Sequence, residues 1–178
     1  TTGSDNTAVG YASLDANTTG IDNTAIGSNA LTSAQTASYN TAVGARALQT
    51  CTGSGHVAVG EDALMTMNSG TQNIAMGQSA LRQLTTGNYN IAIGANALAA
   101  NATFSSNTGV GQAALNACTA NNNSAFGFNA LLANTTGTQN NAFGAYALDA
   151  NTTGSQSNAF GYLSLSNNLS LIHISEPT

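Results

Sequence analysis

The side chains that could carry acid–base or metal chemistry in this sequence are few, and only one small group lies close together. His56 is followed by the adjacent acids Glu61 and Asp62. An imidazole and two carboxylates can in principle hold a metal ion. Adjacent residues on a strand point to opposite faces, however, so Glu61 and Asp62 are not expected to share one site. His56 also stands where most copies of a repeat carry Asn, which makes a structural role the simpler interpretation.

Sequence motifs typical of enzymes are absent. The chain has no CxxC, HExxH, phosphate-binding loop or GxSxG pattern. Its two cysteines, Cys51 and Cys118, are too few for a disulfide framework. We therefore expect a protein that is not an enzyme, with no catalytic residue, no cofactor and no metal site.

The composition excludes two classes of partner. Only 5% of the residues are charged, the formal net charge is -5, and the basic side chains are limited to Arg46 and Arg82. A nucleic-acid binder needs many Lys or Arg to replace phosphate counterions, so nucleic acid is excluded. No stretch approaches the 18 consecutive apolar residues of a membrane span, so we expect no membrane insertion in this segment.

The sequence consists largely of a short unit that is repeated ten times in tandem, and the candidate residues His56, Glu61 and Asp62 lie within it. The stretch from Asn23 to Leu31 reads NTAIGSNAL, and its pattern recurs in steps of 17 residues, with two steps of 16. Aligned on the Gly, the copies form columns of identical or similar residues. The Gly column includes Gly10, Gly27 and Gly44; the Leu column Leu14, Leu31 and Leu48; the opening Asn column Asn6, Asn23, Asn40, Asn73 and Asn90; and the Thr column Thr19, Thr36 and Thr52.

The repeat predicts an all-β fold, a parallel β-solenoid of about ten 17-residue coils. Short tandem units stack on their neighbours as a solenoid, and the helical kinds need about 33 to 47 residues per unit. Gly, Asn and Thr are poor in helix interiors. β-branched residues recur at alternate positions, as in Ile91 and Ile93, which is the period of a strand. We expect one strand at NTAVG, a bend at the Gly, a Leu-anchored turn and a second short strand near the Thr.

Each column is expected to have one structural role. The apolar residue before each Gly and the Leu should both point inward and form a thin core, with Phe126, Phe143 and Phe160 in the same apolar column. The Gly should supply a bend with positive φ or leave room for a passing backbone. The Asn and Thr columns should hydrogen-bond to their own copies in adjacent coils. The Ala column should pack closely against a neighbouring chain.

The repeat register also places the cysteines. Cys51 and Cys118 fall in one column four coils apart, which corresponds to roughly 19 Å at the spacing of a parallel ladder. The Cα atoms of a disulfide lie within about 7 Å of each other. We therefore expect no disulfide between them.

Two surface features are candidates for binding a partner. Phe128, Tyr146 and Tyr162 follow the Gly column and are possible surface-contact residues, either as sugar-stacking rings or as packing contacts between chains. The Thr column could order water as an ice-binding face, although the file beside it is broken by residues such as Gln35 and Cys51. An alternative function is therefore a monomeric β-solenoid that binds a ligand or ice through its Thr ladder.

The repeats define the domain boundaries. Residues 1–168 are expected to form a single β-solenoid domain, a fragment of a longer repeat protein that is open at both ends. The last ten residues, LSLIHISEPT, fit no copy of the unit. They resemble the translation of a sequencing-library adapter, so we expect residues 169–178 to be a non-native tail with no part in the fold.

The unit N-[TSI]-A-[VIMF]-G-x-x-[AS]-L, followed by NTTG, resembles the head repeats of YadA-like trimeric autotransporter adhesins. It is closer still to the NTAIG…AL…NTTG repeats of bacterial surface and tail-fibre-like proteins. The resemblance implies a left-handed β-roll, three chains packed side by side as a homotrimer, and an adhesive or spacer role. It also implies a place on the bacterial cell surface or a phage tail, outside the cell, with a host-surface protein or glycan as a possible partner. The YadA-like unit is usually nearer 14 residues, and we expect no stalk, anchor or chaperone domain within these 178 residues.

Overall fold

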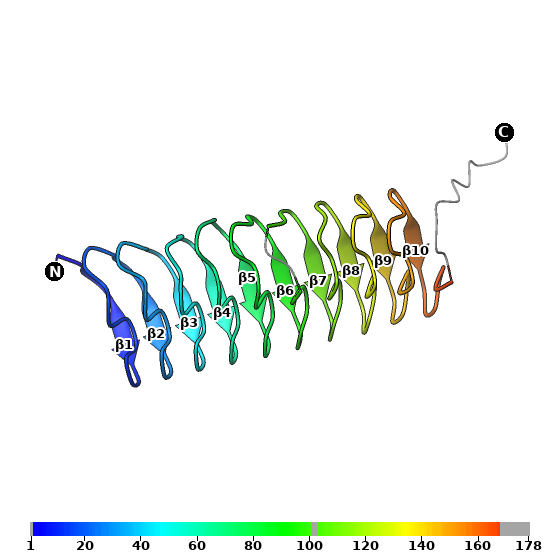
Figure 1. The fold of residues 1–178 in the computed structure, drawn as a ribbon. Coiled ribbons are helices and arrows are strands. Elements are labelled where there is room, and N and C mark those ends of the chain that lie inside the picture. The colour runs from blue at the N-terminus through cyan, green and yellow to red at the C-terminus, as the bar shows by residue number, and fades with distance from the viewer. Residues whose placement is uncertain (1, 101–102, 168–178) are drawn as a thin grey trace.

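The computed structural model describes residues 2–100 and 103–167, so the expected tail at 169–178 lies outside the described residues. Ten strands of three residues each occur, one per copy of the repeat, and Figure 1 shows them side by side along one rod. They are β1 (Thr7–Val9), β2 (Thr24–Ile26), β3 (Thr41–Val43), β4 (Val57–Val59), β5 (Ile74–Met76), β6 (Ile91–Ile93), β7 (Thr108–Val110), β8 (Ser124–Phe126), β9 (Asn141–Phe143) and β10 (Asn158–Phe160).

The ten strands form one parallel sheet in sequence order, β1 to β10, which confirms the predicted parallel β-solenoid. Each strand pairs in register with the next, so that Ala25 lies beside Ala42 and Ala42 beside Ala58. The two 16-residue steps leave this register intact, since β3–β4 and β7–β8 pair as the others do. Within the described ranges there is no helix.

The interior is filled by the Ala, Leu and Asn columns, and the expectation that the residue before each Gly points inward is wrong. Val9 is 57% exposed, and Ile26 and Met76 are about two-fifths exposed, whereas the Ala at the middle of β2 to β6 is fully buried. Alternate strand residues face opposite sides of the sheet, so the Ala and the apolar residue after it cannot both face inward. Phe126, Phe143 and Phe160 are likewise outside the core.

The narrowness of the coil explains this choice. Each coil is a single strand closed by turns, so the strand contributes only the methyl group of its Ala to a narrow interior, and the larger buried side chains come from the rest of the coil. Met67, Leu84 and Phe104 are three of these larger side chains. The one that recurs in every coil is the Leu, buried in the copies Leu14, Leu31, Leu48, Leu64, Leu81, Leu98, Leu115, Leu131 and Leu148. Every one of these Leu residues has a φ near +50°. Left-handed backbone costs a residue with a side chain roughly 1–2 kcal/mol, and burying the Leu, worth about 1.5–3 kcal/mol, offsets it.

The Gly column allows the coils to stack closely. Gly27 has a φ of +134°, and a Cβ placed on it would lie 2.5 Å from the carbonyl oxygen of Gly44 in the next coil. The same geometry recurs along the column, for example between Gly94 and Gly111. Both predicted reasons for the Gly, a positive φ and a close backbone approach, therefore operate at these positions.

The second short strand predicted near the Thr column is not formed in the described residues. That half of the coil consists of bends and turns, and its one strand-like pairing is an isolated bridge between Ser54 and Thr71. The segment is held by hydrogen bonds from backbone N–H groups to side chains of the next coil, such as Ile21 N–H to Ser38 Oγ and Thr71 N–H to Asn88 Oδ1. Side-chain acceptors thus replace part of a backbone ladder.

Candidate functional site

The Asn column forms a buried hydrogen-bonded ladder along the inside of the rod. In each step the Oδ1 of one Asn accepts the backbone N–H of the Asn in the next coil, as between Asn73 and Asn90 at 2.9 Å. The Nδ2 of Asn90 donates to Asn73 Oδ1 and to the carbonyl of Phe104. Equivalent bonds link Asn6, Asn23 and Asn40. The ladder lets a polar side chain occupy the core with its bonding groups satisfied.

The Thr column does not make such a ladder. The residues Thr19, Thr36 and Thr52 are all exposed, as are its later members. The hydroxyl bonds that do occur nearby run to backbone carbonyls, such as Thr18 Oγ1 to the carbonyl of Gln35. The column is therefore a row of exposed side chains on a turn.

His56 takes one place in the Asn ladder and is fully buried. Its backbone N–H donates to Asn40 Oδ1, and its Nδ1 accepts the backbone N–H of Asn73 at 3.2 Å. The Nε2 atom has no hydrogen-bond partner of good geometry. Burial lowers the pKa of His56 from 6.5 to about 4, and the carbonyl of Gly70, which favours the charged ring, opposes this shift only in part. His56 and the exposed Glu61 therefore do not form the metal site considered from sequence.

The buried imidazole predicts an acid-sensitive stability. The unfolded chain takes up a proton near pH 6.5 and the folded chain near pH 4. Between these values the unfolded state binds more protons, so stability falls as the pH falls, by about 3 kcal/mol in total. His56→Asn restores the residue of the other copies and should remove this pH dependence. Urea unfolding at pH 7.5 and pH 4 measures it; equal losses in both proteins would contradict the assignment.

The two cysteines lie on the inner side of the coil and are not bonded to each other. Each Sγ lies within hydrogen-bonding distance of a nearby carbonyl, that of Gly53 for Cys51 and that of Ala120 for Cys118. Burial raises the pKa of Cys51 to about 12 and raises that of Cys118 as well. Thiols held neutral in this way are poor nucleophiles and poor metal ligands.

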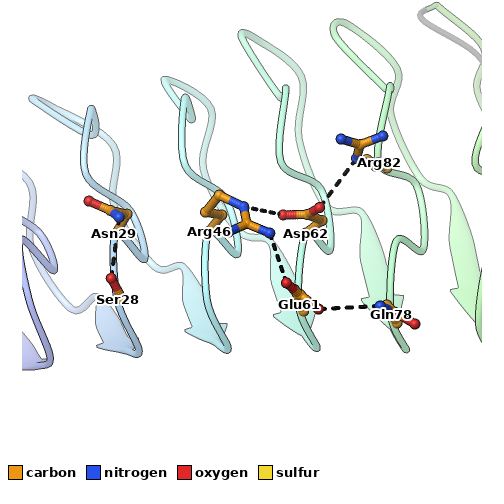
Figure 2. A network of polar contacts seen from close by, with 7 residues as sticks. All are labelled: Ser28, Asn29, Arg46, Glu61, Asp62, Gln78 and Arg82. Atoms are coloured by element: carbon orange, nitrogen blue, oxygen red, sulfur yellow. Dashed lines mark hydrogen bonds and ion pairs between the residues drawn. The ribbon is translucent and has the colours of Figure 1, made fainter.

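A network of charged side chains spans the turns that follow β3, β4 and β5. Arg46 donates from Nε to Asp62 at 2.6 Å and from a terminal nitrogen to Glu61 at 2.8 Å. Arg82 approaches the other Asp62 oxygen at 3.4 Å, and Gln78 donates to Glu61. Figure 2 shows these contacts crossing three successive coils. Hydrogen bonds to Asp62 and Glu61 raise the pKa of Arg46 above its ordinary value.

The network satisfies charges within the rod instead of offering them to a ligand. It contains both basic residues of the chain, and each is paired with Asp62. Exposed ion pairs contribute little stability individually, about 0–1 kcal/mol. Its structural effect is to join three neighbouring coils at one corner.

The outward side of the sheet carries two columns of side chains without a single charge. One is the apolar column that precedes the Gly, and the other is the first residue of each strand, which is Thr in β1 to β3 and Val or Ile in β4 to β6. We call these two columns the sheet face. In the apolar column, the described members are Val9, Ile26, Val43, Val59, Met76, Ile93, Val110, Phe126, Phe143 and Phe160.

Aromatic rings lie in two separate rows near the last coils. On the sheet face, Phe126, Phe143 and Phe160 stack with centroids 4.7 and 5.0 Å apart and nearly parallel planes. Beyond the Gly column, Phe128, Tyr146 and Tyr162 form a second row with centroids 5.2 and 6.2 Å apart. Phe128 and Tyr162 are exposed and Tyr146 is half-buried. The proposed contact residues are thus brought together as one row.

Comparisons with known proteins do not identify a function for these columns and rows of side chains. Comparison of the chain with protein-family models, curated proteins and solved structures finds no match in any of the three. Among the described residues, no three His, Cys, Asp or Glu side chains gather in a way that could hold a metal ion. The described part of the chain also contains no helix able to cross a membrane.

Proposed function

We propose that this chain is a structural and adhesive repeat module of an extracellular surface or tail-fibre-like protein, acting as a rigid rod without catalysis. The β-solenoid fold fits a repeat structural module. The adhesin or tail-fibre role, and the location on a bacterial surface or phage tail, are carried from the resemblance of the repeat unit to YadA-like heads.

We further propose that three copies pack side by side through the sheet face. The observation that carries this proposal is the long uncharged strip of exposed and half-buried apolar side chains, which runs from Val9 to Phe160 along ten strands. Contiguous exposed apolar surface of this kind marks interaction sites in soluble proteins. The sequence predicts that the Ala column contacts a neighbouring chain, but the Ala side chains of β2 to β6 are buried within their own chain. We therefore assign the contact between chains to the sheet face.

The alternative, a monomer that binds ice or a ligand through the Thr ladder, has less support. The Thr column is exposed, but it lies on bends and not on a strand, so it is not part of the parallel sheet. The residues beside it include Thr18, Gln35 and Thr85, which do not form a second uniform file.

The association of chains can be tested by the mass of the protein in solution. We expect light scattering or native mass spectrometry to give three times the chain mass. Replacing Ile26 and Ile93 together by Glu places unpaired charges on the sheet face and should return the protein to a monomer, because burying such charges is costly. The matched control replaces Thr36 and Thr86 by Glu in the exposed Thr column, outside the sheet face, and should leave the trimer intact. A monomeric unmodified chain would contradict the proposal.

A further inference from the structure

We propose that the row formed by Phe128, Tyr146 and Tyr162 binds neutral glycans, by stacking sugar rings against the aromatic faces. This inference rests on the proposed adhesive function and names the chemistry of its partner. It uses a surface separate from the sheet face, which is assigned to contacts between chains.

The two aromatic rows differ in what they present to solvent. Rings in the sheet-face row stack almost parallel, at 7° and 4°, so both faces of Phe143 are covered by its neighbours. Such a row exposes ring edges and suits close packing against another chain. It leaves no central ring face on which a sugar could lie.

The second row is arranged edge to face. The plane of Tyr146 is turned by 72° from that of Phe128 and by 82° from that of Tyr162. Because neighbouring rings are nearly perpendicular, they cannot all cover one another's faces along the rod axis. Either Tyr146 or its two neighbours therefore direct their ring faces away from that axis. A ring face of this kind carries negative charge density, which attracts the slightly positive C–H groups on the flat side of a sugar ring. The two Tyr hydroxyl groups add hydrogen-bonding capacity at the wet edge of the row.

The electrostatics of this end of the rod select an uncharged ligand. From Thr103 to Asn167 the only charged side chain is Asp149. Both Arg residues belong to the network around Asp62, in earlier coils. No Arg or Lys is therefore available near the row to pair with a sialic acid carboxylate or a sulfate. The polar residues of this region are instead Asn, Gln, Ser and Thr, which suit sugar hydroxyl groups.

The test removes the row without disturbing the coil. In each variant, the new residue is one that another copy of the unit carries at the equivalent position. These are Gln112 for Phe128→Gln, Asn129 for Tyr146→Asn and Ser28 for Tyr162→Ser. Asn also suits the positive φ of 59° at Tyr146. The control variant replaces Phe126, Phe143 and Phe160 by Val, the residue at position 110 of that column.

Binding is measured on immobilised neutral oligosaccharides of glucose, galactose, mannose and N-acetylglucosamine, each beside a sialylated or sulfated counterpart. We expect the full chain to bind neutral members, the row variant to bind them at least about tenfold more weakly, and the control to retain binding. Preference for acidic glycans, equal binding by the row variant, or no binding to the panel would each overturn the proposal. Solution mass is measured on the same samples, so a monomer that binds neutral glycans would reject the trimer and keep this inference.

Discussion

Replacing Gly94 by Ala should disrupt the coil around β6 more than any exposed substitution in the rod. The new methyl group would lie 2.5 Å from both the carbonyl carbon and the carbonyl oxygen of Gly111. These are backbone atoms of the next coil, so no side chain can move aside to relieve the overlap. With the added strain of a φ of +132°, we expect a loss above about 4 kcal/mol in the free energy of unfolding, a value typical of core disruption. Urea unfolding followed by far-UV circular dichroism measures it.

Gly161 provides the matched control for this experiment. It belongs to the same column and has a similar φ of +123°, but a Cβ placed on it meets nothing within 4 Å. Gly161→Ala should therefore cost only the backbone strain, roughly 1–3 kcal/mol. Equal losses for the two variants would mean that close stacking of the coils contributes nothing and that backbone conformation alone requires the Gly.

Replacing Asn90 by Ala should break the buried amide ladder and strongly destabilise the rod. The side chain of Asn90 bonds to Asn73 Oδ1 and to the carbonyl of Phe104, and its own Oδ1 accepts the backbone N–H of Asn107. Ala leaves the Phe104 carbonyl and the Asn107 N–H buried without these partners, at about 1–3 kcal/mol each, so we expect a loss of about 4 kcal/mol. Hydrogen exchange should show the largest loss of protection at Asn107.

Asn96 is the control for this variant. It lies on the exposed corner of the same coil, at a position where a later copy of the unit carries Ala113 with a similar φ near +55°. Asn96→Ala should cost no more than about 1 kcal/mol, the usual range for a surface substitution. If Asn90→Ala were as mild as Asn96→Ala, the buried ladder would not be a source of stability.

The sequence predicts the architecture of this protein well because the repeat carries most of the information. Ten Gly residues in one column define the number of coils and their register, and the strands occur at the predicted NTAVG segments. Likewise, one shared column for Cys51 and Cys118 correctly predicts that they do not form a disulfide.

The direction of the side chains is harder to predict, because the strand pattern is ambiguous in a coil this thin. Ala and Ile are both apolar, and when they are adjacent in a strand the larger side chain is the one usually expected to be buried in the core. Here the polar Asn23 lies inside, with its bonding groups satisfied by the coils on either side, and Ala25 follows it inward while Ile26 faces out. The ladder of buried amides thus decides which face of the strand is the interior.

Two further features leave no signal in a single sequence. The positive φ of Leu residues such as Leu81 contradicts their local preference, and it is adopted because the turn buries the side chain. The arrangement of Phe128, Tyr146 and Tyr162 as one edge-to-face row also requires coordinates, since Tyr146 stands one position later in its unit than the other two.

The pairing of each strand only with its immediate neighbours has a consequence for how such a molecule can vary in length. Each coil adds one strand spacing of roughly 4.8 Å and repeats the same bonds above and below it. A gene that gains or loses one unit therefore lengthens or shortens the rod by a fixed increment, with no rearrangement elsewhere. The two 16-residue steps leave the strand pairing unchanged, so variation in the length of a unit is absorbed by the turns and not by the sheet. The length of the rod is therefore determined by the number of coils, with one strand in each coil.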